Sequence, residues 1–215
     1  MQPKVLLHVW RFLVALVALA ATAGEADAQF RTDCSTASAA AAGVSVGRSS
    51  SYFDLSQGVV EPDERGSILI RDGMYLGGRV DLPVAGPWRA RVEGSMANWR
   101  AERQIYGADF QLVGTDTLGD VKARQIVGMI GLQGGRSPVC AYVLGGGGIY
   151  SISYRAASLR RPGVALTAGI EVPTGDHGAV QVDVNLHIIN TGVRDPVASS
   201  AVLAASLAVG WAYKF

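Results

Sequence analysis

The C-terminal stretch at residues 207–215 (LAVGWAYKF) constrains the fold of this chain more than any other feature. Large apolar or aromatic side chains alternate there with small or polar ones, a period of two that places them on one face of a β-strand. In water, a terminal strand with an exposed aromatic row would be an unprotected edge. In a transmembrane barrel the same row faces lipid, and its aromatic end lies at the membrane interface. The stretch therefore favours the closing strand of a membrane β-barrel.

The N-terminal stretch predicts export. Lys4 and Arg11 precede an apolar run at residues 12–23, and residues 26–28 (ADA) have the small-x-small pattern of a cleavage site. This order is typical of a secretory signal peptide. A membrane-anchoring helix would need about 20 apolar residues, more than the run supplies. We therefore expect a signal peptide at residues 1–28, a periplasmic lead-in at 29–40 and an outer-membrane β-barrel domain at 41–215.

Alternating segments recur along the rest of the chain and bring the number of expected strands to eight. They lie at residues 41–53, 74–84, 88–99, 121–133, 139–153, 164–172, 180–188 and 200–215. The phase of the fourth and fifth stays open, because both faces carry apolar residues. Short turns at 85–87, 134–138 and 173–178 would lie at one end and longer connections, especially 100–120, at the other, as in outer-membrane barrels. The expected fold is all-β, an eight-stranded antiparallel up-and-down transmembrane β-barrel.

A soluble β-sandwich or lipocalin-like barrel would show the same alternation, since its sheets also have one apolar face. The signal peptide and the aromatic C-terminus favour the membrane barrel over this alternative. An even strand number would then place both termini in the periplasm.

Four stretches carry a family resemblance: AYVLGGGGIY, GVALTAGIEVP, VQVDVNLHIIN and the terminal LAVGWAYKF. From about Val44 to Phe215 the chain resembles the OmpA/OmpX-like eight-stranded outer-membrane barrels (the outer membrane protein β-barrel domain). The resemblance implies a place in the cell outer membrane of a Gram-negative envelope. It also implies a structural, adhesion or surface-interaction role through external loops, without a defined ligand. Because no peptidoglycan-binding domain follows, the OmpX-like arrangement is expected.

The same resemblance implies that the closing strand is an assembly signal. Trp211, Tyr213 and Phe215 would be recognised by the barrel-assembly machinery. Lipid and lipopolysaccharide are the other expected partners, together with an unknown surface ligand, and the barrel is expected to be a monomer. The net charge of +1 gives no indication of nucleic-acid binding.

Charged side chains fall on the inward faces of the expected strands. Four basic and four acidic groups, together with one histidine, would share the lumen: Arg79, Arg89, Arg91, Lys214, Asp81, Glu93, Glu171, Asp183 and His187. An eight-stranded barrel is just wide enough to be filled by side chains. Buried charges are tolerated only when they are paired. We therefore expect a charge-paired plug rather than a selective pore, with a small channel as an alternative.

His187 raises a second alternative, a lipid A-modifying esterase. Barrel-type lipid A deacylases carry a His-x-Ser-Asn run on the penultimate strand. The corresponding run here is His187-Ile188-Ile189-Asn190, so an isoleucine stands where acyl transfer needs a serine hydroxyl. A catalytic triad with one role unfilled does not support catalysis. We expect no enzyme activity and no catalytic residues.

Metal and cofactor sites are also not expected. Glu61, Asp63 and Glu64 are interrupted by Pro62 and Arg65, which breaks the spacing of an EF-type calcium loop. The glycine run at residues 145–148 is not followed by the Lys-Ser/Thr of a phosphate loop.

Two cysteines, Cys34 and Cys140, would lie in an oxidising compartment where a disulfide can persist. Residues 34–41 can extend roughly 25 Å, enough to cross the barrel mouth, so the two can be paired.

Basic residues gather at two expected external loops: Arg100, Arg103 and Lys122, and Arg155, Arg160 and Arg161. Guanidinium groups bind phosphate well, so contact with lipopolysaccharide phosphates and ordinary solvation both remain open.

Overall fold

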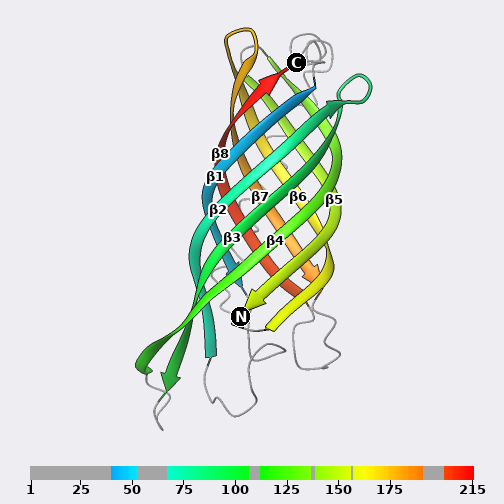
Figure 1. Cartoon of the computed structure of the whole chain (residues 1–215). Coiled ribbons are helices and arrows are strands. Elements are labelled where there is room, and N and C mark those ends of the chain that lie inside the picture. Colours follow the sequence, from blue (N-terminus) through cyan, green and yellow to red (C-terminus); the bar gives the residue numbers. More distant parts are fainter. Residues whose placement is uncertain (1–39, 53–66, 107–111, 137–138, 156, 191–200) are drawn as a thin grey trace.

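The computed structural model describes residues 40–52, 67–106, 112–136, 139–155, 157–190 and 201–215. Within them the chain forms eight antiparallel strands that close into a barrel in chain order (Figure 1). The strands are β1 (Ala41–Tyr52), β2 (Ser67–Pro83), β3 (Trp88–Tyr106), β4 (Leu112–Arg136), β5 (Val139–Tyr154), β6 (Ala157–Thr174), β7 (Gly178–Asn190) and β8 (Ala201–Lys214). The predicted eight-stranded up-and-down barrel is confirmed. No helix in this part of the chain is long and apolar enough to cross a membrane.

The barrel closes through the pairing of β1 with β8. The two strands pair continuously from Ala41 opposite Lys214 to Tyr52 opposite Leu203. Beyond the last pair, the Phe215 amide donates to the Ala40 carbonyl at 2.9 Å. Closure gives the backbone groups of the barrel wall partners on both sides, which a hydrocarbon environment requires. The end at which β1 begins and β8 finishes is called the terminal end below, and the opposite end the far end.

Large apolar side chains cover the outside of this barrel. They alternate with inward residues and are strongly exposed: Val44, Val46, Met74, Leu76, Val80, Leu82, Val92, Met96, Ile126, Ile130, Val143, Ile149, Val164, Ile170, Ile188, Leu207 and Val209. In water, leaving this surface exposed would cost about 25 cal/mol of free energy for each Å² of apolar area, relative to burying it. Against lipid tails the same surface carries no such penalty. The inverted arrangement confirms a membrane barrel over the soluble alternatives.

Aromatic side chains border the apolar surface at the terminal end. The rings of Trp211, Tyr213 and Phe215 follow one another on the outside of β8, with centroids 6.3 and 5.4 Å apart, and His177 stacks on Tyr213. Such girdles mark the level of the membrane interface. The role of Trp211, Tyr213 and Phe215 as an assembly signal stays a prediction.

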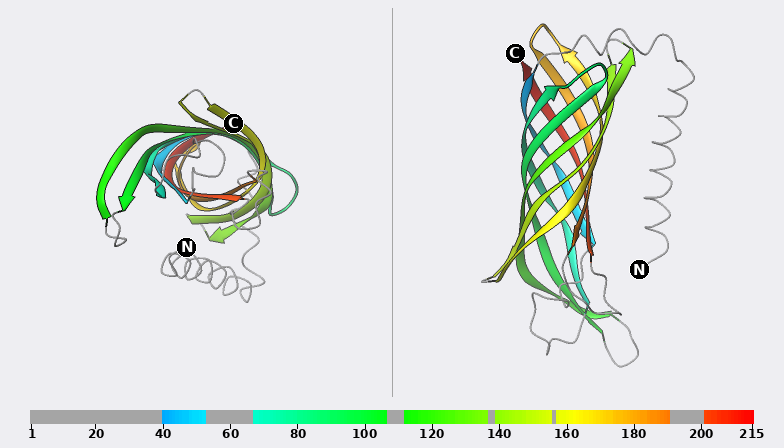
Figure 2. Two further views of the ribbon diagram at one scale, coloured as in Figure 1. Left: turned by 90° about the horizontal axis from the view of Figure 1, so that it is seen from below. Right: turned by 90° about the vertical axis from the view of Figure 1, so that its right-hand side faces the viewer.

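The predicted loop at residues 100–120 is wrong for most of its length, because β3 and β4 continue through it as a paired hairpin. Arg100 lies opposite Asp120, and the pairing runs to Tyr106 opposite Leu112. On the other side, β2 pairs with β3 from Ser67 opposite Gln104 onwards. The three strands thus project beyond the barrel rim, with the β3–β4 hairpin splaying from the ring (Figures 1 and 2). We call residues 67–71, 100–106 and 112–120 the external sheet.

The expected external loop that holds Arg155, Arg160 and Arg161 is also largely strand, since β6 begins at Ala157. Both errors have one cause. Outside the lipid, the outward face of a strand no longer needs apolar side chains, so the alternation that marks a strand in sequence is lost.

The open phases of the fourth and fifth strands are resolved by burial. On β4, Val127 and Met129 face the lumen and Ile126 and Ile130 face outward. On β5, Tyr142 and Leu144 face inward, while Val143 is exposed.

Two glycines on β6 make room for large lumen side chains. A Cβ at Gly169 would lie 2.6 Å from the Tyr142 hydroxyl oxygen, and one at Gly163 would lie 2.7 Å from the ring of Tyr150. Both tyrosines therefore lie against bare backbone, which lets an eight-stranded lumen hold them.

The predicted signal peptide (1–28), Cys34 and the acidic residues Glu61, Asp63 and Glu64 lie outside the described residues. The domain boundaries stay a prediction.

Candidate functional site

The lumen near the terminal end holds a cluster of buried ion pairs around Asp81 on β2. Arg89 Nη2 donates to one carboxylate oxygen at 2.7 Å, and Arg91 Nε donates to the other at 2.7 Å. Arg79 Nε lies 3.6 Å from the same carboxylate. Strand alternation explains the grouping, because every second residue of the β2–β3 hairpin faces the lumen.

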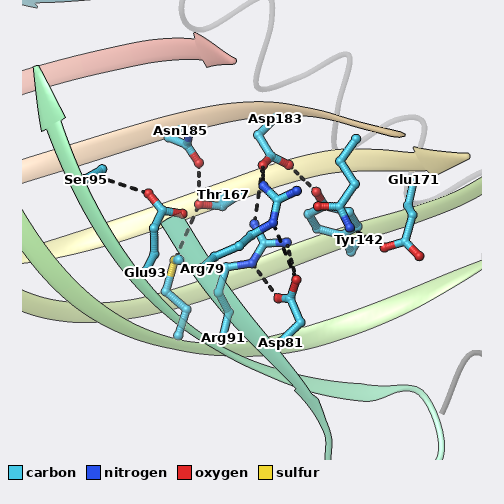
Figure 3. A network of polar contacts seen from close by, with 12 residues as sticks. Arg79, Asp81, Arg91, Glu93, Ser95, Tyr142, Thr167, Glu171, Asp183 and Asn185 are labelled. Carbon is cyan, nitrogen blue, oxygen red and sulfur yellow. Dashed lines mark hydrogen bonds and ion pairs between the residues drawn. The ribbon is translucent and has the colours of Figure 1, made fainter. Parts of the chain in front are cut away.

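Asp183 on β7 is the second anionic centre (Figure 3). It accepts from Arg79 Nη1 at 2.6 Å, lies 3.5 Å from Arg91 Nη1, and accepts a hydrogen bond from the Tyr142 hydroxyl. The Tyr142 ring lies under the guanidinium groups of Arg89 and Arg91, at 5.0 and 4.9 Å. Cation–π contact adds to the ion pairs at this point.

Glu171 on β6 extends the cluster towards the mouth of the terminal end. It lies 3.0 Å from Arg89 Nη1 and 2.7 Å from Lys214 Nζ, and it accepts from Gln181 Nε2 at 2.5 Å. Its burial is nearly complete, at 1% exposure. Seven of the predicted lumen residues thus form one connected network: Arg79, Asp81, Arg89, Arg91, Glu171, Asp183 and Lys214.

Glu93 and His187 lie apart from these ion pairs, in a second network of hydroxyl and amide groups. Glu93 Oε1 accepts from the Tyr75 hydroxyl at 2.5 Å and from Ser95 Oγ at 3.3 Å. Ser95 Oγ in turn accepts from Gln125 Nε2 at 2.7 Å, and the same nitrogen lies 3.1 Å from His187 Nε2. The buried carboxylate is therefore stabilised by hydroxyl donors rather than by a cation.

The tautomer of His187 follows from its partners. Because Gln125 Nε2 only donates, His187 Nε2 is the acceptor and the ring proton lies on Nδ1. That proton points to the Tyr150 hydroxyl oxygen, 3.1 Å away, and Tyr150 donates to the Val164 carbonyl. His187 is thus a fully engaged structural group facing the lumen, and neither of its partners is a serine.

The far half of the lumen is filled by apolar side chains, so the predicted charge-paired plug occupies only part of the lumen. The cluster continues along β4 and β5 to Met129 and Tyr142, beside the ion pairs, and comprises Ala97, Trp99, Ala101, Val121, Ala123, Val127, Met129, Tyr142, Leu144, Tyr150, Ile152, Tyr154, Ala165, Ile189, Val202 and Ala204. At its border with the His187 network, a cavity of about 10 Å³ lies beside Trp99 and Gln125. That volume accommodates about one water molecule.

The residues that sequence reasoning missed are the aromatic and amide partners of the charges. Tyr75, Tyr142 and Gln125 each hydrogen-bond to a predicted lumen residue or to its neighbour. Tyr75 shares the face of Arg79 and Asp81 on β2, so strand phase could have found it. Tyr142 and Gln125 lie on the two strands whose phase the sequence leaves open.

Cys140 lies at the start of β5, is buried and is disulfide-bonded. Cys34, the other cysteine of the chain, lies outside the described residues, and the pairing of these two stays a prediction. Among the described residues, no three His, Cys, Asp or Glu side chains are grouped as a metal ion would require.

Comparison with solved structures identifies the architecture. Neisserial surface protein A matches with a TM-score of 0.56 and 10% identity, over 82% of this chain and 97% of that one. The outer membrane protein OprG from Pseudomonas aeruginosa matches with a TM-score of 0.53 and 15% identity, over 82% and 94%. The chain has the fold of an eight-stranded outer-membrane β-barrel. At the level of fold, the resemblance to OmpA/OmpX-like barrels and the outer-membrane localisation are confirmed. No family model and no curated protein matches the chain.

Replacing Asp81 with Asn should strongly destabilise the barrel. The substitution keeps the shape but leaves Arg89 and Arg91 without their shared anion, and breaking a buried pair costs about 3–5 kcal/mol. Urea unfolding in lipid vesicles, followed by tryptophan fluorescence, measures the change in unfolding free energy.

Asp176→Asn is the matched control, because Asp176 is an exposed carboxylate in the turn between β6 and β7. Its effect should stay within about 0.5 kcal/mol. Equal unfolding midpoints for the two variants would show that the ion pairs around Asp81 do not support the fold.

Replacing His187 with Gln should leave lipid A chemistry unchanged. The side chain is a hydrogen-bonding group between Tyr150 and Gln125, so its loss should cost about 1–3 kcal/mol of stability through an unsatisfied partner. Mass spectrometry of lipid A from cells expressing each form tests this. A deacylated species present with the wild type and absent with His187→Gln would establish the esterase alternative instead.

Proposed function

We propose that this protein is a closed, non-enzymatic outer-membrane barrel that acts through surface interactions of its external sheet. The observation that carries the proposal is the continuation of β2, β3 and β4 beyond the rim of a lumen that is filled throughout. The membrane-spanning part then serves as an anchor, and the projecting part is available to a partner. The terminal end, with its short turns, faces the periplasm in this proposal.

The filled lumen argues against the channel alternative. Towards the terminal end, the path along the axis meets the paired charges around Asp81 and Asp183, which are at most 3% exposed. Towards the far end it meets Trp99, Val121 and Ile152, which are buried to the same degree. A pore would need both layers to separate, at the cost of unpaired buried charges.

The free edge of the external sheet supports a binding role. Pairing of β4 with β5 begins only at Val121 opposite Tyr154. Residues 112–117 of β4 therefore have a paired strand on one side alone within the described part of the chain, whereas the Leu118 carbonyl accepts from the Tyr154 hydroxyl of β5 at 3.2 Å. An unpaired strand edge can accept a further strand from another protein through main-chain hydrogen bonds. Thr115 and Thr117 are exposed along it, which gives such an edge a polar character.

Shortening the external sheet should abolish surface binding without disturbing the barrel. Arg100 and Asp120 lie opposite each other, so an Asn-Gly turn can replace residues 101–119 and still leave Trp99 paired with Val121. Adherence of bacteria expressing each form to epithelial monolayers and to immobilised matrix proteins should fall about ten-fold, to the level of cells without the protein.

The control is a variant with a Gly/Ser sequence of the same length at residues 101–119. It separates the loss of the strand edge from the loss of chain length. It should adhere as weakly as the shortened form if the strand edge makes the contact. Undiminished adherence of the shortened form would exclude the external sheet as the binding element.

A closed lumen predicts the absence of steady ion conductance. Purified wild-type barrel in planar bilayers should give no stable openings, because charges and apolar side chains fill both halves of the lumen. The conductance of Asp81→Asn should be measured alongside the wild type. Among single substitutions, removing this shared anion unpairs the lumen charges and so favours entry of water most. Stable unitary currents from the wild type would establish the channel alternative.

A further inference from the structure

The apolar surface of the barrel ends abruptly on the wall formed by β4, β5 and β6. Ile126, Ile149 and Pro162 lie opposite one another across the three strands and face outward. The next outward row towards the far end consists of Arg124, Ser151 and Arg160. Outward rows of a strand are about 7 Å apart, so the change from hydrocarbon-facing to charged side chains occurs within one step.

This row has the shape of a cradle. Neighbouring strands are about 4.8 Å apart, so the Cα atoms of Arg124 and Arg160 lie roughly 10 Å from each other with Ser151 between them. Both arginines are exposed, and the short serine side chain leaves the space between them open. One row further out, Lys122 lies opposite Ser153. We call Lys122, Arg124, Ser151 and Arg160 the basic cradle.

The charge of the cradle is not balanced by acidic groups nearby. Lys122, Arg124 and Arg160 form no ion pair within the described part of the chain. The nearest outward carboxylate on β4, Asp120, lies opposite Arg100 on β3. On the opposite wall, Arg48 shares a groove with Asp72. Positive charge is therefore concentrated on one wall, at the border of the lipid.

We infer that the basic cradle binds a phosphate group of an outer-leaflet glycolipid, with the acyl chains of that lipid lying along Ile126 and Ile149. Two guanidinium groups and an ammonium can share a phosphate, with the Ser151 hydroxyl as a further donor. Phosphate-bearing lipopolysaccharide combines this anion with hydrocarbon directly below it, which matches the two adjoining rows. The inference rests on the proposed orientation, in which the far end faces outward, and does not depend on the external sheet.

The inference is a specific form of one alternative left open by the sequence, contact with lipopolysaccharide phosphates, but it places that contact on other residues. The basic residues at 122, 124 and 160 belong to strands of the barrel wall rather than to loops, and Arg124 lies outside the two basic groups that the sequence indicates. Register, rather than composition, brings Arg124 and Arg160 to the two sides of one serine.

Native mass spectrometry of the detergent-purified full barrel tests the inference. The probes are diphosphoryl lipid A, chemically dephosphorylated lipid A, phosphatidylglycerol and inorganic phosphate. The wild type should retain diphosphoryl lipid A in preference to the other three. The double variant R124Q/R160Q should bind diphosphoryl lipid A at least about ten-fold more weakly. Each arginine that is lost removes a charge-assisted hydrogen bond to the phosphate, and the loss of both accounts for a change in affinity of this size.

Arg48→Gln is the matched control on the opposite wall, and it should change lipid A retention less than about two-fold. Ser151→Asp is a second test that keeps both arginines and places an anion in the cradle, so it should lose retention as R124Q/R160Q does. Heat-modifiable migration on gels shows that each variant has folded.

Four results would overturn the inference: undiminished lipid A retention by folded R124Q/R160Q, equal loss in Arg48→Gln, equal retention of phosphatidylglycerol, or displacement of lipid A by equimolar inorganic phosphate. The last two would assign the cradle to ordinary phospholipid or to free phosphate. The cradle lies outside residues 101–119, so loss of adherence and loss of lipid A binding are independent results.

Discussion

Backbone hydrogen bonding in hydrocarbon is the constraint on which the rest of this structure depends. An unpaired N–H or C=O group there costs several kcal/mol, so β1 must find a partner and only β8 is left to provide one. The twelve consecutive pairs from Ala41 opposite Lys214 to Tyr52 opposite Leu203 meet this requirement. Closure with eight strands then fixes the width of the lumen, and with it the amount of side chain the inside must hold.

A lumen of that width cannot be left empty, and the two halves are filled by different means. Near the terminal end, Asp81 and Asp183 each face two or more guanidinium groups, so desolvation of the charges is offset by short, shared contacts. In the far half, Trp99 and its neighbours form an apolar core of the kind found inside soluble proteins. Between these two layers, a series of hydrogen bonds runs from Glu93 to His187 through hydroxyl and amide groups. Its alternating donors and acceptors join the charged layer to the apolar one.

Much of the fold could be predicted from the sequence because lipid imposes a strict rule on half of the residues. Where a strand faces hydrocarbon, as at residues 180–188, alternation alone gives its span, its phase and the inward position of Asp183 and His187. Where lipid ends, the rule lapses, and the pattern at residues 100–120 predicts a loop although residues 100–106 and 112–120 form paired strands. The phase of β4 and β5 was hidden for another reason, since both faces of these strands contact apolar surroundings in the far half of the barrel.

Contacts between strands distant in sequence were beyond any local pattern. That Arg89 would meet Glu171, or Arg91 the ring of Tyr142, follows from the curvature and register of the closed barrel, which no single strand encodes. The same holds outside the barrel, where Arg124 and Arg160 are separated by an entire strand in the chain and by one serine in space. Closure therefore determines more than the wall. It also brings residues from different strands together in layers stacked along the barrel axis. The chemistry of each layer depends on its surroundings: charges are paired inside the lumen, apolar side chains face hydrocarbon on the outside, and cationic side chains lie where the hydrocarbon ends.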